Sequence, residues 1–389
     1  MNTDDTALAR SAPTRWATRI QFFCSGFIFA TWGVHIPSVK AHYGLDEAAL
    51  GLAMLAAGCG ALFGISRAGG WIGRHGAARM SLVTGGIYAL LLALLTHMPS
   101  YALLLVLLAA FGLVTSVFDV AVNTEASQIE LHGGRPLMSG MHGMFSLGGM
   151  AGALSGSAAL AAGLAPNRHL AIVAGAMALA VVGAARWMLP RRFTASTAPA
   201  EGGLRLPRAA LVVLGVLAAL GLIAEGAMYD WSVLYLQQEL GSPQQQAALA
   251  YASFSAAMAA ARFGGDALRA RMAPGTLLRV SASLAAVSMT VVLLTASPWV
   301  ALAGFAGVGI GFANVVPVLF AAAARVPGVD AARGIAAVSA AAYLGFMAGP
   351  PVIGLLARVG SLTAALSVVV VFALALALAA PRDATGTPI

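Results

Sequence analysis

Apolar runs that are each long enough to cross a lipid bilayer recur along this chain, and they constrain its fold more than any other feature. The run YALLLVLLAAFGLV at 101–114 is one example. A bilayer core takes about 20 apolar residues per helix, and a backbone in lipid must satisfy its own hydrogen bonds within helices or a closed barrel. The alternating pattern of barrel strands is not seen. The sequence therefore predicts an all-α membrane protein.

Twelve transmembrane helices are predicted from these runs and from the turn residues that separate them, such as HMPS at 97–100 and GSP at 241–243. The composition agrees, because 60% of the residues are hydrophobic and 9% are charged, against about 25% charged residues in soluble domains. The first run is too long for the apolar part of a signal peptide and is counted as a helix. The expected spans are 18–40, 48–66, 80–98, 101–124, 138–163, 169–188, 209–236, 246–263, 276–296, 299–324, 335–357 and 362–380.

Basic residues fall mainly on one side of the predicted membrane topology. If the N-terminus is cytoplasmic, all of the 22 lysines and arginines except Lys40, Arg168 and Arg358 lie in or beside cytoplasmic segments. Lys and Arg are enriched on that side of a membrane, so both termini are expected to be cytoplasmic and the protein to lie in the cell (inner) membrane. The net charge of +8 is then a topology signal, and no nucleic-acid partner is expected.

The two halves of the chain resemble each other. RAGGWIGR at 67–74 returns as RFGGDALR at 262–269, an offset of 195 residues (262 minus 67), and GLVTSVFD at 112–119 pairs with GVGIGFAN at 307–314 at the same offset. Glycine rows of this kind are typical of close helix packing, with sliding surfaces as a secondary role. Two such rows correspond near an offset of 197, namely Gly148, Gly152 and Gly156 in the first half and Gly345, Gly349 and Gly354 in the second.

The repeat predicts two pseudo-symmetric six-helix bundles. The N-terminal bundle is expected over 1–188 and the C-terminal bundle over 209–389. Between them, the segment 189–208 is rich in Pro, Ala and Arg and indicates a cytoplasmic linker.

The chain contains no motif for a cofactor or a catalytic centre. A nucleotide-binding loop, zinc-ligand spacing and a nucleophile elbow are missing from the sequence. Two cysteines, Cys24 and Cys59, are too few for a disulfide scaffold or a cysteine-based metal site. No enzyme activity, metal or cofactor is therefore expected.

Twelve spans in two repeats, with Arg/Gly loops after the second and eighth helices, resemble the major facilitator superfamily over nearly the whole chain. The first loop reads GGWIGRHGAAR at 69–79, with Gly73 where the superfamily carries an aspartate. Within the superfamily, DVAVN at 119–123, MHGMFSLGGMAG at 141–152 and AEGAMYDWSVLYL at 224–236 resemble the fucose-permease-like branch and MosC-like membrane proteins. The resemblance implies a transporter that works as a monomer. It also implies gating residues in the two loops: Arg67, Arg74, Arg262, Asp266 and Arg269.

Three of the 14 acidic residues lie inside predicted spans, and they are Asp119, Glu225 and Asp230. A charge at a helix centre costs about 3 kcal/mol on insertion scales, so such residues usually face the bundle interior and mark a pathway. Asp119 and Glu225 are therefore candidates for proton coupling, while a carboxyl group bonded to a neighbouring helix is the structural alternative. Asp119 also matches the acid that begins an acid-x-A-x-N string in the resembled fucose-permease pattern, where that acid is linked to proton coupling.

Polar and aromatic residues near these acids are candidates for binding a substrate. Asn123 shares a helix face with Asp119, and Tyr229 shares one with Glu225, because each pair is four residues apart. An acid and a phenol can combine hydrogen bonding with stacking on a sugar-like ring, whereas an aromatic belt at the membrane interface is the alternative for Trp231. The expected binding residues are Trp32, His35, Asn123, His142, Tyr229, Asp230, Asn314 and Tyr343.

His35, His142 and Asn314 are assigned as binding residues for reasons other than closeness to an acid along a helix. His35 could titrate in a span without an acid, although a lone histidine near a helix end is often interfacial. His142 forms a polar stripe with Ser139 and Ser146, which suits binding and helix–helix contacts equally well. Asn314 is the repeat partner of Asp119, and Pro317 after it is expected to loosen the helix, as in helices that line transport sites.

The sequence favours a secondary transporter of a small polar organic solute, such as a sugar, polyol or amino sugar, that is proton-coupled and works by alternating access. A proton-driven exporter of drugs or metabolites is the first alternative. The glycine–proline string expected of exporters is absent from GMFSLGGMAG in the fifth helix, while a similar GFMAGPP occurs in 335–357. A non-transporting membrane sensor is the second alternative, and it predicts that Asp119 is dispensable.

Overall fold

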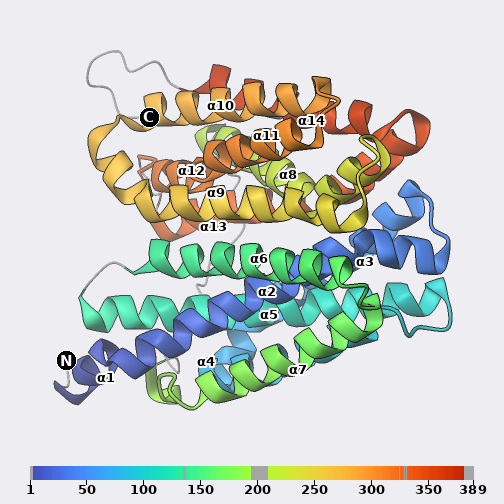
Figure 1. The fold of residues 1–389 in the computed structure, drawn as a ribbon. Helices are drawn as coiled ribbons and strands as arrows, with labels where there is room; N and C mark the ends of the chain where they lie inside the picture. Colours follow the sequence, from blue (N-terminus) through green and yellow to red (C-terminus); the bar gives the residue numbers. More distant parts are fainter. Residues whose placement is uncertain are drawn as a thin grey trace. The chain divides into compact units, whose positions relative to one another are not determined.

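The protein is built from α-helices in the computed structural model, which describes residues 3–134, 137–193, 209–323, 325–327, 329 and 331–380. No strand occurs among these residues (Figure 1), and the predicted all-α class is confirmed. The helices of the first half are α1 (Thr3–Arg10), α2 (Ala12–Tyr43), α3 (Glu47–His75), α4 (Ala77–Leu94), α5 (Tyr101–Gly133), α6 (Met138–Ala161), α7 (Pro166–Ala185) and the 3-10 turn η1 (Arg191–Phe193). Those of the second half are α8 (Ala209–Gln238), α9 (Gln244–Arg271), α10 (Pro274–Leu294), α11 (Pro298–Phe312), α12 (Val315–Ala323), α13 (Ala331–Val359) and α14 (Leu362–Ala379).

Within the described residues, 11 segments are long and apolar enough to cross a membrane, and they correspond to all but one of the predicted spans. The remaining predicted span, 246–263, falls on α9, a helix of 28 residues. The apolar residues of α9 are mainly alanines, and it carries Arg262, so its hydropathy is lower than that of the other spans. By its place in the chain, α9 is the eighth of the twelve transmembrane helices.

The predicted span 299–324 is divided into two helices, α11 and α12, with Ala313 and Asn314 in a turn between them. Pro317 explains the break, because a proline has no N–H to donate to the carbonyl four residues earlier and its ring clashes with that carbonyl. The carbonyl concerned is that of Ala313. The loosening that the sequence predicts at Pro317 is therefore a turn in the middle of a span.

The two Arg/Gly strings, predicted to form loops, are helical. The string at 67–74 lies in α3, which is followed by Gly76 with a φ of 87°, a backbone angle that favours glycine. The string at 262–269 lies in α9, which ends shortly before Pro274. The loop prediction is wrong, because hydropathy marks where a segment leaves the lipid and not where its helix ends. The side chains of Asp266 and Arg269 lie outside the described part of the chain.

The chain forms two compact units. The first comprises Met1–Leu45 and Ala53–Ala200, and the second comprises Asp46–Leu52 and Glu201–Ile389, so that the first turn of α3 belongs to the second unit by its contacts. The predicted bundle boundaries at 1–188 and 209–389 stay predictions. Most of the expected linker 189–208 lies outside the described residues.

The glycine rows lie in helix pairs whose backbones touch, α2 with α6 in the first unit and α8 with α13 in the second. A Cβ atom at Gly148 would collide with the backbone of Phe23, and one at Gly345 would collide with Ala219. The glycines are 197 residues apart (345 minus 148) and the residues they touch are 196 apart (219 minus 23). The close packing expected of the glycine rows is therefore confirmed in both units.

A second pair of contacts corrects the register of the repeat. Gly112 of α5 packs on the backbone of Ala57 in α3, and Gly309 of α11 packs in the same way on Phe254 in α9. Both steps are 197 residues (309 minus 112, and 254 minus 57). Gly307, which the sequence match pairs with Gly112, instead faces Ser288 of α10. The sequence match has an offset of 195 residues, whereas the packing contacts repeat at 197, a difference of two residues. The pairing of Asp119 with Asn314 rests on the sequence match alone.

Candidate functional site

Asp119 and Asn123 form one polar pair on α5. The Asn123 Nδ2 donates to the backbone oxygen of Asp119 at 2.9 Å and to its Oδ1 at 3.1 Å. Both residues are half-buried, and Phe118, Ala121 and Val122 beside them are fully buried. The amide therefore fixes the orientation of the carboxyl group, as the four-residue spacing predicts. A carboxyl group held in this way can take up a proton, or accept a hydrogen bond from a hydroxyl group of a solute.

Aromatic side chains from two other helices pack against phenylalanines of α5. The ring of Trp32 on α2 lies 6.3 Å from that of Phe111, and the ring of Tyr88 on α4 lies 4.8 Å from the same phenylalanine. Tyr88 also contacts Phe118, at 6.4 Å between ring centroids. Trp32 is only 4% exposed. It therefore contributes to packing within the first unit, and its role as a stacking wall for a substrate stays a prediction.

His35 is fully buried and bonded to a second histidine. Its Nε2 lies 2.8 Å from the Nδ1 of His169 on α7, and the Nε2 of His169 lies 3.3 Å from the hydroxyl of Ser155 on α6. The Nδ1 of His35 lies 3.4 Å from the hydroxyl of Ser38. The interfacial interpretation of His35 is wrong, since its exposed fraction is 0%. At this distance one ring nitrogen donates to the other, so the tautomers of the two histidines are coupled.

The sequence did not single out His169 or Ser155, because they lie 134 and 120 residues from His35 (169 minus 35, and 155 minus 35) on other helices. No local pattern joins them. One feature of the sequence could have pointed to His169. It falls just inside an apolar span, where polar side chains are uncommon and need a partner.

In the second unit, Glu225 of α8 forms an ion pair with Arg262 of α9. The Arg262 Nη2 lies 3.1 Å from Glu225 Oε1, and the two side chains are 16% and 9% exposed respectively. The hydroxyl of Tyr229 donates to the same oxygen at 3.3 Å. Tyr229 packs in turn against Tyr251 and Phe254, at 5.2 Å and 5.1 Å between ring centroids. Arg262, expected at a gating loop, thus belongs to the same cluster as the proton-coupling candidate Glu225.

The remaining candidates of the second unit are Asp230, Asn314 and Tyr343. Asp230 is 7% exposed on α8 and makes no hydrogen bond or ion pair with any residue that the structure describes. Asn314 is 4% exposed, and a Cβ atom at Gly265 of α9 would come within 2.7 Å of its Oδ1. Tyr343 on α13 is 41% exposed. Their binding roles stay predictions.

Three further candidates are exposed or lie against aromatic rings. His142 on α6 is exposed, and its ring meets that of Phe22 edge-on at 5.4 Å. Arg67 lies 5.3 Å from the ring of Phe63, one turn earlier on α3. Arg74 is exposed near the end of the same helix. The binding role of His142 and the gating roles of Arg67 and Arg74 therefore stay predictions.

One buried acid was missed by the sequence analysis. Glu125 on α5 is fully buried and accepts a hydrogen bond from the backbone N–H of Leu189, while its Oε2 has no partner among the described residues. The prediction ended this span at residue 124 and counted Glu125 as a helix end. Because α5 runs on to Gly133, Glu125 lies inside the helix. It fixes the segment that follows α7.

The chain belongs to the major facilitator superfamily, whose family model matches residues 20–332. It is 33% identical over 365 residues to an uncharacterized MFS-type transporter of Yersinia pestis, with 94% of each chain covered. It is 31% identical over 379 residues to the membrane protein MosC of Rhizobium meliloti, covering 96% of this chain and 91% of that one. The protein is therefore a multi-pass membrane transporter rather than an enzyme.

Solved structures share the fold at low sequence identity. A crystal structure of a mutant of the nucleoside transporter NupG aligns with a TM-score of 0.77 and 14% identity, covering 94% of this chain and 98% of that one. A crystal structure of a D-xylose-proton symporter aligns with a TM-score of 0.71 and 12% identity, covering 94% of this chain and 96% of that one. This likeness confirms the predicted fold of twelve helices in two pseudo-symmetric six-helix bundles.

Proposed function

We propose that the protein is a proton-coupled secondary transporter of a small polar organic solute, of the sugar, polyol or amino-sugar kind. It would work by alternating access, with the two bundles changing their relation around a bound solute. The observation that carries the proposal is that each unit has an acid-centred cluster built on its membrane helices. These clusters are Asp119 with Asn123, and Glu225 with Arg262 and Tyr229.

The Glu225 cluster supports proton coupling through competition for one oxygen. Arg262 and Tyr229 both bind Oε1 of Glu225. A proton on the carboxyl group removes its charge and weakens the ion pair, which leaves the guanidinium and the hydroxyl available to a solute. Solute binding and proton binding are then linked by a shared partner, and such linkage is reciprocal.

The chemistry of the two clusters favours a solute with several hydroxyl groups. An amide, a phenol and a guanidinium supply hydrogen-bond donors, while Trp32 and Tyr229 supply ring faces that can stack on a sugar ring. The nucleoside transporter and the D-xylose-proton symporter with the same fold carry solutes of this kind by their names. We further propose an inner-membrane location with both termini cytoplasmic, from the distribution of arginines, and a monomeric state.

The proposal is tested first by ligand-dependent thermal unfolding of the purified protein, then by flux. A solute that binds only the folded state raises the unfolding temperature. The panel contains sugars, polyols, amino sugars and lipophilic cations, and each hit is tested in proteoliposomes that contain a pH-sensitive dye. We expect one polar solute to stabilise the protein and to carry protons with it.

Asp119→Asn is the matched variant, because asparagine keeps an Oδ1 that can accept from Asn123 while it removes the titratable group. We expect this variant to fold and to bind the solute, and to lose proton-driven accumulation at least tenfold. Stabilisation by lipophilic cations alone would favour the exporter. A folded protein that exchanges no member of the panel, with Asp119→Asn indistinguishable from wild type, would favour the sensor.

A further inference from the structure

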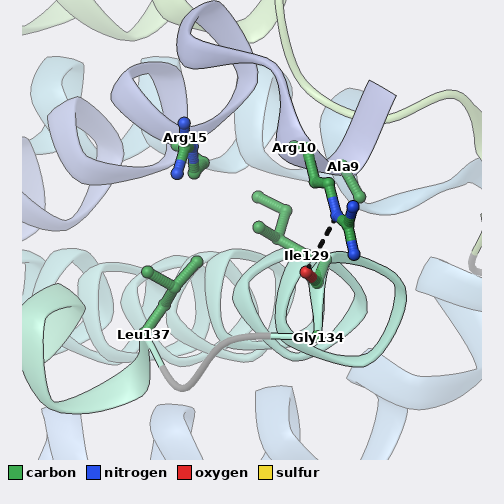
Figure 2. Close-up of a pocket in the computed structure, with 7 residues that line it drawn as sticks. Ala9, Arg10, Arg15, Ile129, Gly134 and Leu137 are labelled. Carbon is green, nitrogen blue, oxygen red and sulfur yellow. Dashed lines mark hydrogen bonds between the residues drawn. The ribbon is translucent and has the colours of Figure 1, made fainter. Parts of the chain in front are cut away.

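A cavity of about 270 Å³ lies in the first unit. Figure 2 shows it between the α1–α2 segment, which contributes Arg10 and Arg15, and the end of α5, which contributes Ile129 and Gly134. Ile129 is ten residues beyond Asp119 on the same helix, which is about 15 Å at 1.5 Å per residue. The cavity is therefore separate from the Asp119–Asn123 pair.

Two guanidinium groups line this cavity. The Nε of Arg10 donates to the backbone oxygen of Gly133 at 3.2 Å, the contact that is dashed in Figure 2. Arg15 is half-buried, and its side chain makes no hydrogen bond or ion pair with any residue that the structure describes. A guanidinium has five N–H donors and no acceptor. Most donors on the two side chains are therefore available to a ligand.

No acid among the described lining residues balances these two charges. The acid nearest along the chain, Glu130, uses its Oε2 to accept from the backbone N–H groups of Leu137 and Met138, at 2.7 Å and 3.1 Å. The two guanidinium charges repel each other, and an anion bound between them would offset this repulsion. The electrostatics of the cavity thus favour an anionic ligand.

The size of the cavity limits that anion to a compact group. Its volume is far above the roughly 30 Å³ that one water occupies in the liquid, and it is just below the roughly 300 Å³ at which pockets for drug-sized ligands begin. A phosphate group is larger than one water and smaller than a drug-sized ligand, so it suits this volume. Its oxygens also match the planar fork of an arginine, which can bind two of them at once.

Exposed apolar residues on the helices that form the cavity indicate where such a phosphate comes from. Leu8 on α1, Trp16 on α2 and Leu131 on α5 are 37%, 55% and 69% exposed. Arg19 lies 5.0 Å from the ring of Trp16. Tryptophan and arginine side by side, with exposed leucines, are typical of the membrane interface. We propose that this cavity binds the phosphate headgroup of an anionic phospholipid, with its acyl chains on the exposed apolar residues.

The test measures the unfolding temperature of the full-length protein in detergent micelles. Phosphatidylglycerol, phosphatidylcholine and inorganic phosphate are each titrated at constant ionic strength. Arg15→Gln is the main variant, since its side chain has no partner to lose, and Arg10→Gln is the second. Arg79→Gln, which changes an exposed arginine on α4, is the charge-matched control.

We expect phosphatidylglycerol to stabilise the wild type and the Arg79→Gln control alike, and to bind Arg15→Gln about tenfold more weakly, a difference of about 1.4 kcal/mol. Stabilisation by inorganic phosphate at similar strength, lost in Arg15→Gln, would support the phosphate site but assign it to a soluble phosphate compound. Equal effects of phosphatidylglycerol and phosphatidylcholine, or the same response in Arg15→Gln and wild type, would overturn the proposal.

Discussion

Replacing Glu225 by glutamine tests the buried ion pair of the second unit most directly. The Glu225 and Arg262 side chains are 9% and 16% exposed, and their charged atoms are 3.1 Å apart. Removal of one member of a buried pair costs about 3–5 kcal/mol, because the other charge is left without compensation. Glutamine keeps an oxygen that can accept from Arg262 and Tyr229, so we expect a loss of unfolding free energy near the lower figure, about 3 kcal/mol.

An exposed ion pair of the same unit supplies the control. Arg358 lies 3.6 Å from Asp46, and these side chains are 61% and 49% exposed. Exposed pairs contribute about 0–1 kcal/mol, so Asp46→Asn should change the unfolding free energy by less than 1 kcal/mol. Both variants are measured by reversible unfolding in detergent, beside Arg262→Gln and the double variant of Glu225 and Arg262.

The double variant separates the pair from its surroundings. If Glu225 and Arg262 act mainly on each other, the combined loss should be smaller than the sum of the single losses by about 1–3 kcal/mol. Replacing both by apolar residues, as in Glu225→Leu with Arg262→Met, should restore most of the stability, while solute transport should stay abolished. Equal losses for Glu225→Gln and Asp46→Asn, with additive effects in the cycle, would refute the reasoning.

Two other predictions concern the first unit. His169→Phe removes the partner of His35 and of Ser155, so the unfolding free energy should fall by about 1–3 kcal/mol, the cost of leaving buried polar groups unsatisfied. His97→Phe changes an exposed histidine and should have little effect on the unfolding free energy. An equal loss in both variants would contradict the buried histidine pair. Gly148→Ala adds a Cβ against the backbone of Phe23 and should cost about 1–3 kcal/mol by overpacking. The control is Gly175→Ala on α7, where nothing lies within 4 Å of the added atom; it should be neutral or stabilising by up to about 1 kcal/mol. Thermal unfolding of both glycine variants measures these two changes. A neutral Gly148→Ala would contradict the backbone contact with Phe23.

The sequence predicted those parts of the fold that depend on local patterns. Run length and hydropathy are local, so the order and approximate bounds of the spans could be predicted, and so could the break near Pro317. Helix ends were less predictable: α3 continues through Arg67 and Arg74, and α5 continues past Glu125. An α-helix does not have to stop where its residues leave the lipid, because its backbone hydrogen bonds are satisfied on either side.

The site was predicted only where its members share one helix. Asn123 bonds to Asp119 and Tyr229 to Glu225, and both pairs are four residues apart. The partners on other helices, Arg262 and His169, depend on which helix faces pack together, and no spacing in a single sequence gives that. The same limit explains the register error, because two glycine patterns can be matched at neighbouring offsets until packing decides between them.

The backbone contacts of the glycine-packed pairs also have a mechanical consequence. Between α2 and α6, and between α8 and α13, glycine lets main chain lie directly on main chain. No layer of side chains is present at those points to change rotamer and absorb a displacement. Each pair therefore behaves as one stiff element over the length of its glycine row. Any bending or shear inside a unit during transport is borne by the helix contacts that are padded with larger side chains, such as the aromatic contacts of Tyr88 and Tyr229.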